Sequence, residues 1–518
     1  PMSTHYKAFI VVFVLSVIGF VFFRKPYATA IGAKRFDNWR NLWLAITACL
    51  FLIPSFWPYV IISALVVLFM SRPDPLKPAL FMLLLFVSPN IGDAIPGFAG
   101  INKFIMVTPQ AVFTLTLLIP AMIAAPKMKK LTPVGSAADV CFILFLTLQL
   151  ILCLRGPTVT HIIRTMIEQF LVIAPFYFVF SRAPKSLSDI RIISAAYTMP
   201  ILILSALSIL ELIRTWHFYT SVGYNWFGAM PFTYTMRDGF LRASASVVDP
   251  IVWGYIAMTG IGVGLAFFTE NFSKFYKTLG FGLLTIGLLM SLSRGPWMGA
   301  VAMILTFVAI SPKAMTRAAQ LGAASVLGGL VAMVTPFGQK ILNLLPFVGT
   351  TAGDTISYRQ QLLKAAREVM AENPFFGSSD YLDHPKLEAL RQGQGIIDIV
   401  NSYLEIGLKS GFVGITLFVG VFLFALTSLR GAMKSAITYN PTLALYCRAY
   451  FATIVGIMIT IFTTSSVLHT PIVYWSILGL AIALARIERH CRLHHRTADI
   501  DTQSPEPEAE TAPEFNWK

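Results

Sequence analysis

Charged side chains are scarce in this chain of 518 residues. Asp, Glu, Lys and Arg make up 13% of the sequence and hydrophobic residues 56%, whereas soluble domains have about 25% charged and roughly 45–50% apolar residues. Of the 25 acidic residues, eight lie between 338 and 410 and six between 497 and 518. Carboxylates are unfavourable inside a bilayer unless they are paired. The composition excludes an ordinary soluble protein and predicts one integral membrane domain.

Cysteine is also rare, and conventional catalytic motifs are absent. The five cysteines lie in or beside apolar runs and form no C-x-x-C pair, which argues against a disulfide framework and a thiolate metal site. The sequence contains no H-E-x-x-H, G-x-S-x-G, P-loop or dinucleotide-binding glycine motif. We therefore expect no metal, no cofactor and no conventional soluble-enzyme chemistry.

Hydrophobic runs recur from residue 7 to residue 487 with short interruptions. A transmembrane helix needs about 20 apolar residues, and tilted or shorter spans also occur. The expected fold class is therefore an all-α polytopic membrane protein with about 12–15 transmembrane helices. The predicted spans lie near residues 7–23, 42–55, 58–71, 78–89, 109–125, 136–154, 165–181, 190–212, 247–268, 276–292, 296–311, 318–337, 411–429, 443–466 and 471–487.

The net charge of +15 is spread over short basic clusters between these runs. No continuous basic stripe is present, so we expect no nucleic-acid partner. Under the positive-inside rule, one orientation makes all the clusters cytoplasmic. The clusters are Arg24 to Arg40, Lys127 to Lys130, Arg182 and Lys185, Lys274 and Lys277, Lys313 and Arg317, Arg430 and Lys434, and Arg486 to Arg496.

This orientation predicts the organisation of the whole chain. Residues 1–337 would be transmembrane helices with short loops, apart from an outer loop at about 214–246. Residues 338–410 would form a large helical loop on the outer side, and 411–487 the C-terminal transmembrane helices. Residues 488–518, basic and then rich in Pro, Glu and Thr, would be a disordered cytoplasmic tail.

Two helices are predicted in the large outer loop. Ser357 and Gln360 form a capping-box pattern that would start an amphipathic helix ending near residue 372. The Pro and Gly residues of 373–377 predict a bend after it, which would let the loop act as a lid. A second helix would begin near Gly395 and run toward the next span.

Three arginines stand apart from the cytoplasmic clusters. Arg242 and Arg294 lie at outer ends of spans, and Arg359 lies on the first outer helix. A lone arginine at such a place often only reaches toward lipid headgroups. Three of them on the outer side violate the usual charge bias, and guanidinium groups suit two-point contacts with phosphate. The sequence therefore predicts an anionic, phosphate-bearing ligand.

Polar groups in the second half of the outer loop are the candidates for proton transfer. Asp398, Asn401 and Glu405 would share one face of a helix, which is equally the pattern of a solvated helix face. His384 lies in an Asp-His-Pro segment and is a further candidate, although a single loop histidine is more often only exposed to solvent.

These segments together resemble the O-antigen ligase and polymerase superfamily of polytopic glycosyltransferases, the WaaL and Wzy type. The resemblance covers roughly residues 230–430, with the motifs in the family's order around one large outer loop. The matching segments are Arg242 to Pro250 with Trp253-Gly254-Tyr255, Ser291 to Trp297, Arg359 to Gly377, and Val400 to Gly414.

The resemblance implies a fold of the membrane glycosyltransferase C kind and a location in the bacterial inner membrane. It also implies a glycan donor carried on undecaprenyl diphosphate at the periplasmic face, no metal, and inversion of the anomeric centre. In that family arginines hold the donor's diphosphate. This role passes to Arg242, Arg294 and Arg359 of this chain.

One position departs from the family pattern. The family usually has a histidine directly before its Asn-x-Tyr-Leu segment, and that position is Val400 here. Either Asp398 or Glu405 supplies the base instead, or neutralisation of the leaving diphosphate by arginine carries most of the catalysis.

Three functions compete at this point. The favoured one is a repeat-unit polymerase for a surface polysaccharide, with an undecaprenyl-diphosphate-linked oligosaccharide as donor and another as acceptor. A ligase would instead transfer the glycan to lipid A-core or to a protein. A transporter of lipid-linked glycans would call for internal repeats and polar groups at the bilayer midplane, which the sequence does not show. Membrane lipids and other polysaccharide assembly proteins are the further expected partners.

Overall fold

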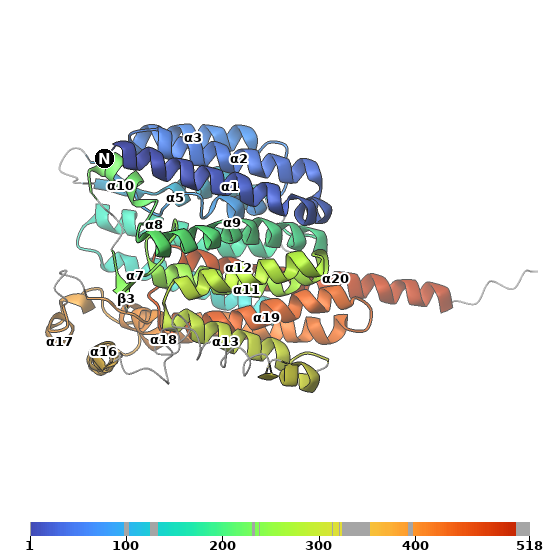
Figure 1. Cartoon of the computed structure of the whole chain (residues 1–518). Helices are drawn as coiled ribbons and strands as arrows, with labels where there is room; N and C mark the ends of the chain where they lie inside the picture. The colour runs from blue at the N-terminus through green and yellow to red at the C-terminus, as the bar shows by residue number, and fades with distance from the viewer. Residues whose placement is uncertain are drawn as a thin grey trace, which may run out of the picture.

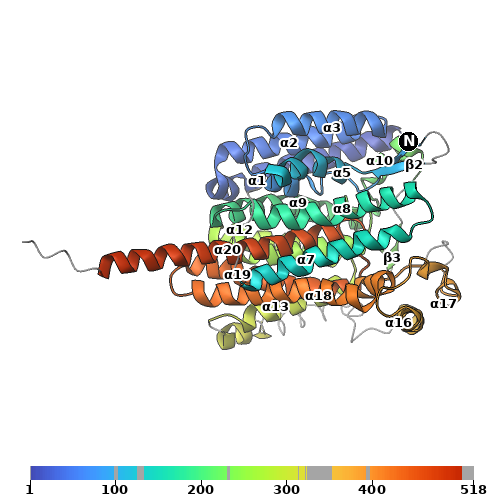
Figure 2. The same ribbon diagram turned by 180° about the vertical axis from the view of Figure 1, so that it is seen from behind.

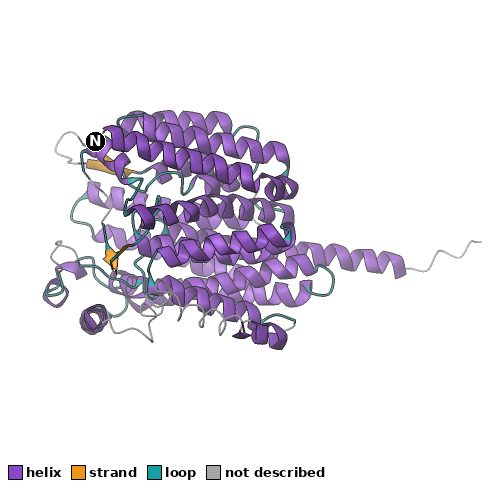
Figure 3. Ribbon diagram, viewed as in Figure 1, coloured by secondary structure: helices purple, strands orange, loops and turns teal. Residues whose placement is uncertain are grey.

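The computed structural model describes residues 2–97, 103–124, 133–229, 234–237, 239–312, 314–320, 322–323, 353–391 and 397–503. Long helices lie side by side in one bundle, with two short β-hairpins near one end (Figures 1 and 3). The helices are α1 (Met2–Ile31), α2 (Ala33–Leu52), α3 (Phe56–Met70), α4 (Lys77–Leu84), α5 (Pro109–Phe113), η1 (Thr114–Leu118), α6 (Ile119–Ala124), α7 (Pro133–Leu152), η2 (Cys153–Arg155), α8 (Val159–Arg182), α9 (Leu187–Arg214), α10 (Thr220–Phe227), α11 (Pro250–Asn271), α12 (Lys274–Met290), α13 (Arg294–Ala309), α16 (Gly353–Glu372), η3 (Tyr381–Asp383), α17 (Pro385–Glu388), α18 (Ser402–Ala436), α19 (Pro441–Ile461) and α20 (Thr470–Gln503). The antiparallel hairpins are β1 (Asp93–Pro96) with β2 (Lys103–Val107) and β3 (Met236–Arg237) with β4 (Phe240–Leu241).

The predicted all-α polytopic membrane fold is confirmed. Within the described residues, eight helices are long and apolar enough to cross a membrane, and three shorter apolar helices accompany them. This count is below the predicted 12–15, because α2 carries four charged residues in its first two turns and α4 has only eight residues. The predicted span at 318–337 lies almost wholly outside the described residues.

Burial separates an inner from an outer set of helices. The most apolar windows of α9, α11 and α20 are 89%, 89% and 94% buried, whereas those of α1 and α7 are each 28% buried. On α1 the exposed side chains include Ile10, Val14, Ile18 and Val21, which share one helical face. Apolar side chains on an outer face are expected where a helix contacts lipid rather than water.

The outer segments gather at one end of the bundle, the loop end. Helices α10, α16 and α17 and the β3–β4 hairpin lie there, while α20 extends beyond the opposite end (Figures 1 and 2). The described parts of segments 214–246 and 338–410 thus lie at the same end of the bundle. A multi-pass chain with alternating helix directions brings such segments together although they are far apart in sequence.

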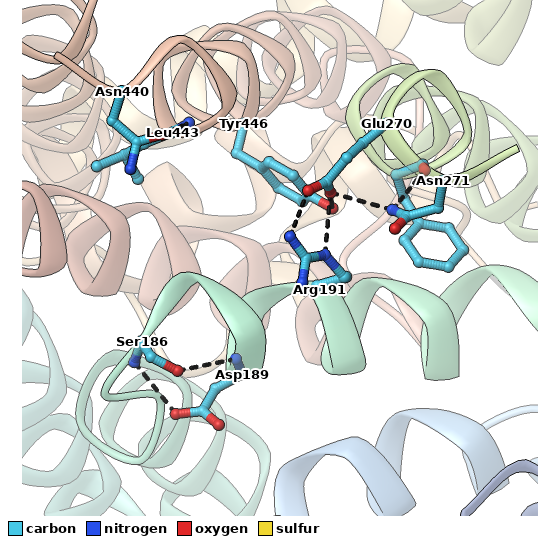
Figure 4. A network of polar contacts seen from close by, with 9 residues as sticks. Ser186, Asp189, Arg191, Glu270, Asn271, Asn440, Leu443 and Tyr446 are labelled. Atoms are coloured by element: carbon cyan, nitrogen blue, oxygen red, sulfur yellow. Dashed lines mark hydrogen bonds and ion pairs between the residues drawn. The ribbon is translucent and has the colours of Figure 1, made fainter. Parts of the chain in front are cut away.

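A polar network ties three helices together at the end opposite the loops (Figure 4). Arg191 of α9 forms an ion pair with Glu270 of α11, and the Tyr446 hydroxyl of α19 donates to the same carboxylate at 2.7 Å. The Asn271 side chain donates to it as well, at 3.0 Å. Such a network adds little net stability, but its fixed geometry disfavours other registers of these helices.

The turn after α16 packs directly on a kink in α18. Gly377 and Gly411 both have positive φ, of 63° and 64°, and the non-helical Gly411 divides α18 into two parts. A Cβ on Gly377 would lie 2.3 Å from the Leu408 carbonyl oxygen, and one on Gly411 would lie 2.4 Å from that of Phe375. Ser378 N–H donates to Leu408 at 2.9 Å. The bend predicted at 373–377 is therefore a docked backbone turn and not an open hinge.

Several predicted boundaries need correction. Helix α16 ends at Glu372 as predicted but begins at Gly353, so Ser357 lies inside the helix. Residues 397–401 are not helical, and the helix predicted from Gly395 starts at Ser402. Helix α20 continues to Gln503, so the disorder predicted for 488–518 does not hold for 488–503. Glu488 contributes to this extension by pairing with Arg492 one turn later, at 3.6 Å.

Candidate functional site

Arg242 holds the turn between α12 and α13. It follows the β3–β4 hairpin, and its Nε donates to the Ser291 carbonyl oxygen at 3.3 Å. Its Nη2 donates to the Ser293 hydroxyl at 2.8 Å. Arg237 of the same hairpin donates to the Leu292 carbonyl oxygen at 2.6 Å. Arg237 and Arg242 thus donate hydrogen bonds to the three successive residues 291–293 of this turn. The next residue in the chain is Arg294.

The segment after Arg242 is strained and strongly held. Ala245 has a positive φ of 49°, which is unfavourable for a residue with a side chain. The buried Glu211 carboxylate of α9 accepts the N–H groups of Ser244 and Ala245 at 3.0 and 2.9 Å. The His217 ring lies 3.4 Å from that carboxylate and 3.1 Å from the Ser244 hydroxyl. These contacts stabilise the strained backbone and keep the neighbouring arginine in place.

Arg294 and Arg359 approach each other from different elements. Arg294 is half-buried at the start of α13, and Arg359 is half-buried on α16. Burial lowers the pKa of Arg359, the carboxylate of nearby Asp398 raises it, and the positive charge of Arg294 lowers it. The Nε of Arg359 is buried without a hydrogen-bond partner among the described residues. A buried N–H group without an acceptor costs about 1–3 kcal/mol, so this group favours a ligand that supplies an oxygen.

Positive charges therefore lie close together at the loop end. Burial lowers the pKa of Arg242 to about 10, and the charge of Arg237 adds to this effect while Asp249 opposes it. Arg237, Arg242, Arg294 and Arg359 all carry guanidinium groups, which are cationic side chains. We call these four residues the arginine cluster. A multivalent anion would relieve the mutual repulsion of these charges.

Asp398 stands beside this cluster. Burial raises the pKa of Asp398, and the negative charges of Asp249 and Glu405 add to this effect. A hydrogen bond from the Ser465 hydroxyl at 3.2 Å and the charge of Arg359 oppose it. A carboxylate with a raised pKa is a better proton acceptor than an ordinary aspartate.

Glu405 is more strongly engaged than Asp398. One of its oxygens accepts from the Lys409 ammonium at 2.7 Å and the other from the Ser466 N–H at 3.2 Å. Both carboxylate oxygens of Glu405 are therefore already bound to protein groups. Of the two predicted carboxylates, Asp398 is therefore the stronger base candidate.

Asn401 and His384 occupy structural positions. The Asn401 side chain caps α18 by accepting the N–H groups of Tyr403 and Leu404 at 2.9 and 3.1 Å. His384 caps the short helix α17 and lies 3.2 Å from the Glu372 carboxylate. Glu372 is 13 residues beyond Arg359 on α16, a distance of about 20 Å along the helix axis. The structure does not bring His384 into the arginine cluster.

Sequence reasoning missed several contributors. Arg237 and Asp249 are charged neighbours of Arg242. Both lie within a few residues of Arg242 in the sequence, and this closeness could have identified them as site candidates. Glu211 and His217 gave no local signal, because their contacts with Ser244 depend on how α9 packs against the hairpin segment.

The region around Arg294 and the outer loop is similar in sequence to a known family. Residues 279–419 match the O-antigen ligase family. The predicted resemblance to the O-antigen ligase and polymerase superfamily is confirmed over this segment. A comparison with curated proteins found no match.

The O-antigen ligase segment contains most of the predicted site. Arg294, Arg359, Asp398 and Glu405 lie within it, whereas Arg242 precedes it. The match to this family supports a glycosyltransferase-like enzyme role, and the apolar helices indicate a multi-pass membrane protein. Arg237 and Arg242 lie outside the matched segment in sequence but contact it in the folded protein, through their hydrogen bonds to the α12–α13 turn.

Proposed function

We propose that this protein is a repeat-unit polymerase for a bacterial surface polysaccharide. It transfers a glycan from undecaprenyl diphosphate to a lipid-linked glycan acceptor at the periplasmic face of the inner membrane. The observation that carries the proposal is the arginine cluster at the loop end, in which the buried Nε of Arg359 has no hydrogen-bond partner among the residues that the structure describes.

The reaction needs a way to stabilise the leaving diphosphate. An acceptor hydroxyl attacks the anomeric carbon of the donor sugar, the bond from that carbon to the diphosphate oxygen breaks, and undecaprenyl diphosphate leaves. Negative charge grows on the diphosphate during this step. Fixed cations in a partly desolvated site stabilise such charge by several kcal/mol, because dielectric screening is weak there.

The acceptor proton also needs a destination. Asp398 supports this role because its pKa is raised and it is an electrostatic neighbour of Arg359. In the proposed mechanism its carboxylate takes the hydroxyl proton during attack. Direct displacement on the face opposite the diphosphate would invert the anomeric centre and require no metal.

The test is a reconstituted reaction with purified protein in detergent and lipid-linked repeat units as the only substrate. A polymerase yields a ladder of longer lipid-linked glycans and releases one undecaprenyl diphosphate per transfer. A ligase yields no ladder until lipid A-core or an acceptor protein is added. Unchanged substrate that only moves between leaflets of a vesicle would contradict both and favour a transporter.

A further inference from the structure

A cavity with several polar side chains in its lining lies at the loop end, apart from the arginine cluster. Its volume is about 460 Å³, and its walls come from the η2 turn between α7 and α8, the start of α8, the loop after α16, and α18. Figure 2 shows the ends of α7 and α8 at the same end of the bundle as α16 and α17. Its polar lining includes Gln149, His161, Gln169, Ser379, Asp380 and Lys409.

The lining offers mainly neutral hydrogen-bonding groups. The Gln149 Nε2 is buried and has no hydrogen-bond partner among the described residues. The two cations of the cavity are already engaged: Arg155 donates to the Phe376 and Gly377 carbonyl oxygens at 3.1 and 2.9 Å, and Lys409 pairs with a carboxylate at 2.7 Å. Amide, hydroxyl and carboxylate groups together suit the hydroxyls of a saccharide better than a diphosphate.

Lys409 connects this cavity to the base candidates. It lines the cavity and pairs with Glu405, one helical turn earlier in α18. Glu405 is in turn an electrostatic neighbour of Asp398, which neighbours Arg359. Lys409, Glu405, Asp398 and Arg359 thus form a chain of neighbouring charged groups from the cavity to the arginine cluster.

The wall of the cavity is preorganised. Arg155 binds two successive carbonyl groups of the turn that leads to Ser379, and Ser378 N–H is bonded to α18. A site that is already ordered loses less conformational entropy when it binds a ligand.

We propose that this cavity binds the saccharide of the acceptor substrate. The inference rests on the proposed polymerase function and adds to it a separate acceptor site on the α7–α8 side of Glu405. Donor and acceptor would then be recognised by different chemistry: the diphosphate by arginines, and the acceptor glycan by amide, hydroxyl and carboxylate groups.

The test compares two probes on the purified full-length protein. One probe is undecaprenyl diphosphate. The other is the free oligosaccharide released by mild acid from the lipid-linked glycans that accumulate in cells lacking this protein. Gln149→Ala, Ser379→Ala and Asp380→Asn should each weaken oligosaccharide binding about tenfold. The two alanine substitutions remove a hydrogen-bonding group, and Asp380→Asn replaces a charged acceptor oxygen with an amide donor. They should leave undecaprenyl diphosphate binding within twofold of the wild type.

Matched controls separate this site from its surroundings. Gln360→Ala and Asp383→Asn change exposed residues outside the cavity lining and should alter neither probe's affinity. Oligosaccharide affinity that is the same in the wild type and all three cavity variants would overturn the acceptor site, as would wild-type protein that does not bind the oligosaccharide. Arg359→Ala tests the proposed function separately, because it should weaken only undecaprenyl diphosphate binding. Unfolding temperatures of the variants identify any that fail to fold, and the three substitutions are judged independently.

Discussion

At the scale of single residues, the loop end contains buried polar and charged groups whose hydrogen bonds or charges are not fully compensated by the described residues. Arg359 keeps a buried Nε without a partner among the described residues, and burial works against the charge of Arg242. Burying charge without full compensation lowers stability, so such groups are typical of sites that bind a ligand.

Arg294→Ala and Arg359→Ala should each lower kcat about 100-fold, because each removes one charge-assisted contact to the leaving diphosphate. The measurement is ladder formation by purified protein at matched concentration. Arg367→Ala on the exposed side of α16 is the control and should keep the wild-type rate. Wild-type rates in both cluster variants would remove these arginines from the mechanism.

Arg242→Lys should be a poor replacement, with activity lowered at least tenfold. Arg242 donates from two different nitrogens to Ser291 and Ser293, and a lysine ammonium cannot reproduce that planar fork. Activity and unfolding temperature should fall together, since the substitution also loosens the turn that carries Arg294. Full activity in Arg242→Lys would show that only its charge matters.

The pH dependence of the rate should report on Asp398. Its raised pKa means that the folded protein protonates this carboxylate at a higher pH than an ordinary aspartate. A general base works only when deprotonated, so the rate should fall as the pH drops through that pKa. Asp398→Asn should lower kcat about 100-fold with little change in donor affinity. The residual rate of this variant should no longer fall as the pH drops through the pKa of Asp398. If Asp398→Asn, Glu405→Gln and His384→Ala all keep normal rates, no side chain among them is an essential base.

At the scale of elements, α16 and α18 are joined by backbone packing that depends on two glycines. The turn after α16 approaches the α18 kink so closely that a Cβ at Gly377 or Gly411 would lie within 2.4 Å of a carbonyl oxygen. Both residues also have a positive φ. The same junction positions Ser379 on one side and Lys409 on the other, so it shapes the proposed acceptor cavity.

Gly377→Ala and Gly411→Ala should each destabilise this junction by at least about 1–2 kcal/mol, from the cost of a positive φ alone. We expect a lower unfolding temperature in detergent, and weaker oligosaccharide binding than wild type. Gly431→Ala is the matched control in the same helix, because a Cβ there meets no atom within 4 Å. Unchanged unfolding temperatures in both variants would contradict the docked junction.

At the scale of the whole molecule, the bundle has two unlike ends. The arginine cluster, the base candidates and the proposed acceptor cavity all lie at the loop end. The basic clusters Arg182 with Lys185 and Lys274 with Lys277 lie at the ends of α8 and α12 opposite the loops. From the positive-inside rule we propose that the loop end faces the periplasm.

A cysteine at Ser379 should react with a membrane-impermeant thiol reagent in intact spheroplasts. The background is a functional variant in which the five native cysteines are replaced. Thr438→Cys, exposed beyond the opposite end of α18, is the control and should react only after the membrane is permeabilised. Labelling of the second cysteine alone in intact spheroplasts would reverse the orientation and place the site on the cytoplasmic side.

The sequence by itself determined the membrane class and the positions of most long helices, and it supplied the residues of the candidate site. Hydrophobicity acts locally along the chain, so runs of apolar residues predict spans wherever they occur. The arginines Arg242, Arg294 and Arg359 could be identified in the same local way. Each lies on the predicted outer side, where the positive-inside rule disfavours basic residues. The resemblance around Arg294 and Asn401 rests on local motifs as well.

Only the tertiary structure decided which of these residues meet. The prediction that Asp398, Asn401 and Glu405 share a helix face was wrong, because residues 397–401 are not helical and Asn401 caps α18. Asp398 and Glu405 are still electrostatic neighbours, because the loop folds back against Ser465 and Ser466. The contact between Arg155 and Gly377 joins residues 222 positions apart. Such contacts depend on how helices pack, and local hydrophobicity and helix propensity contain no information about that packing.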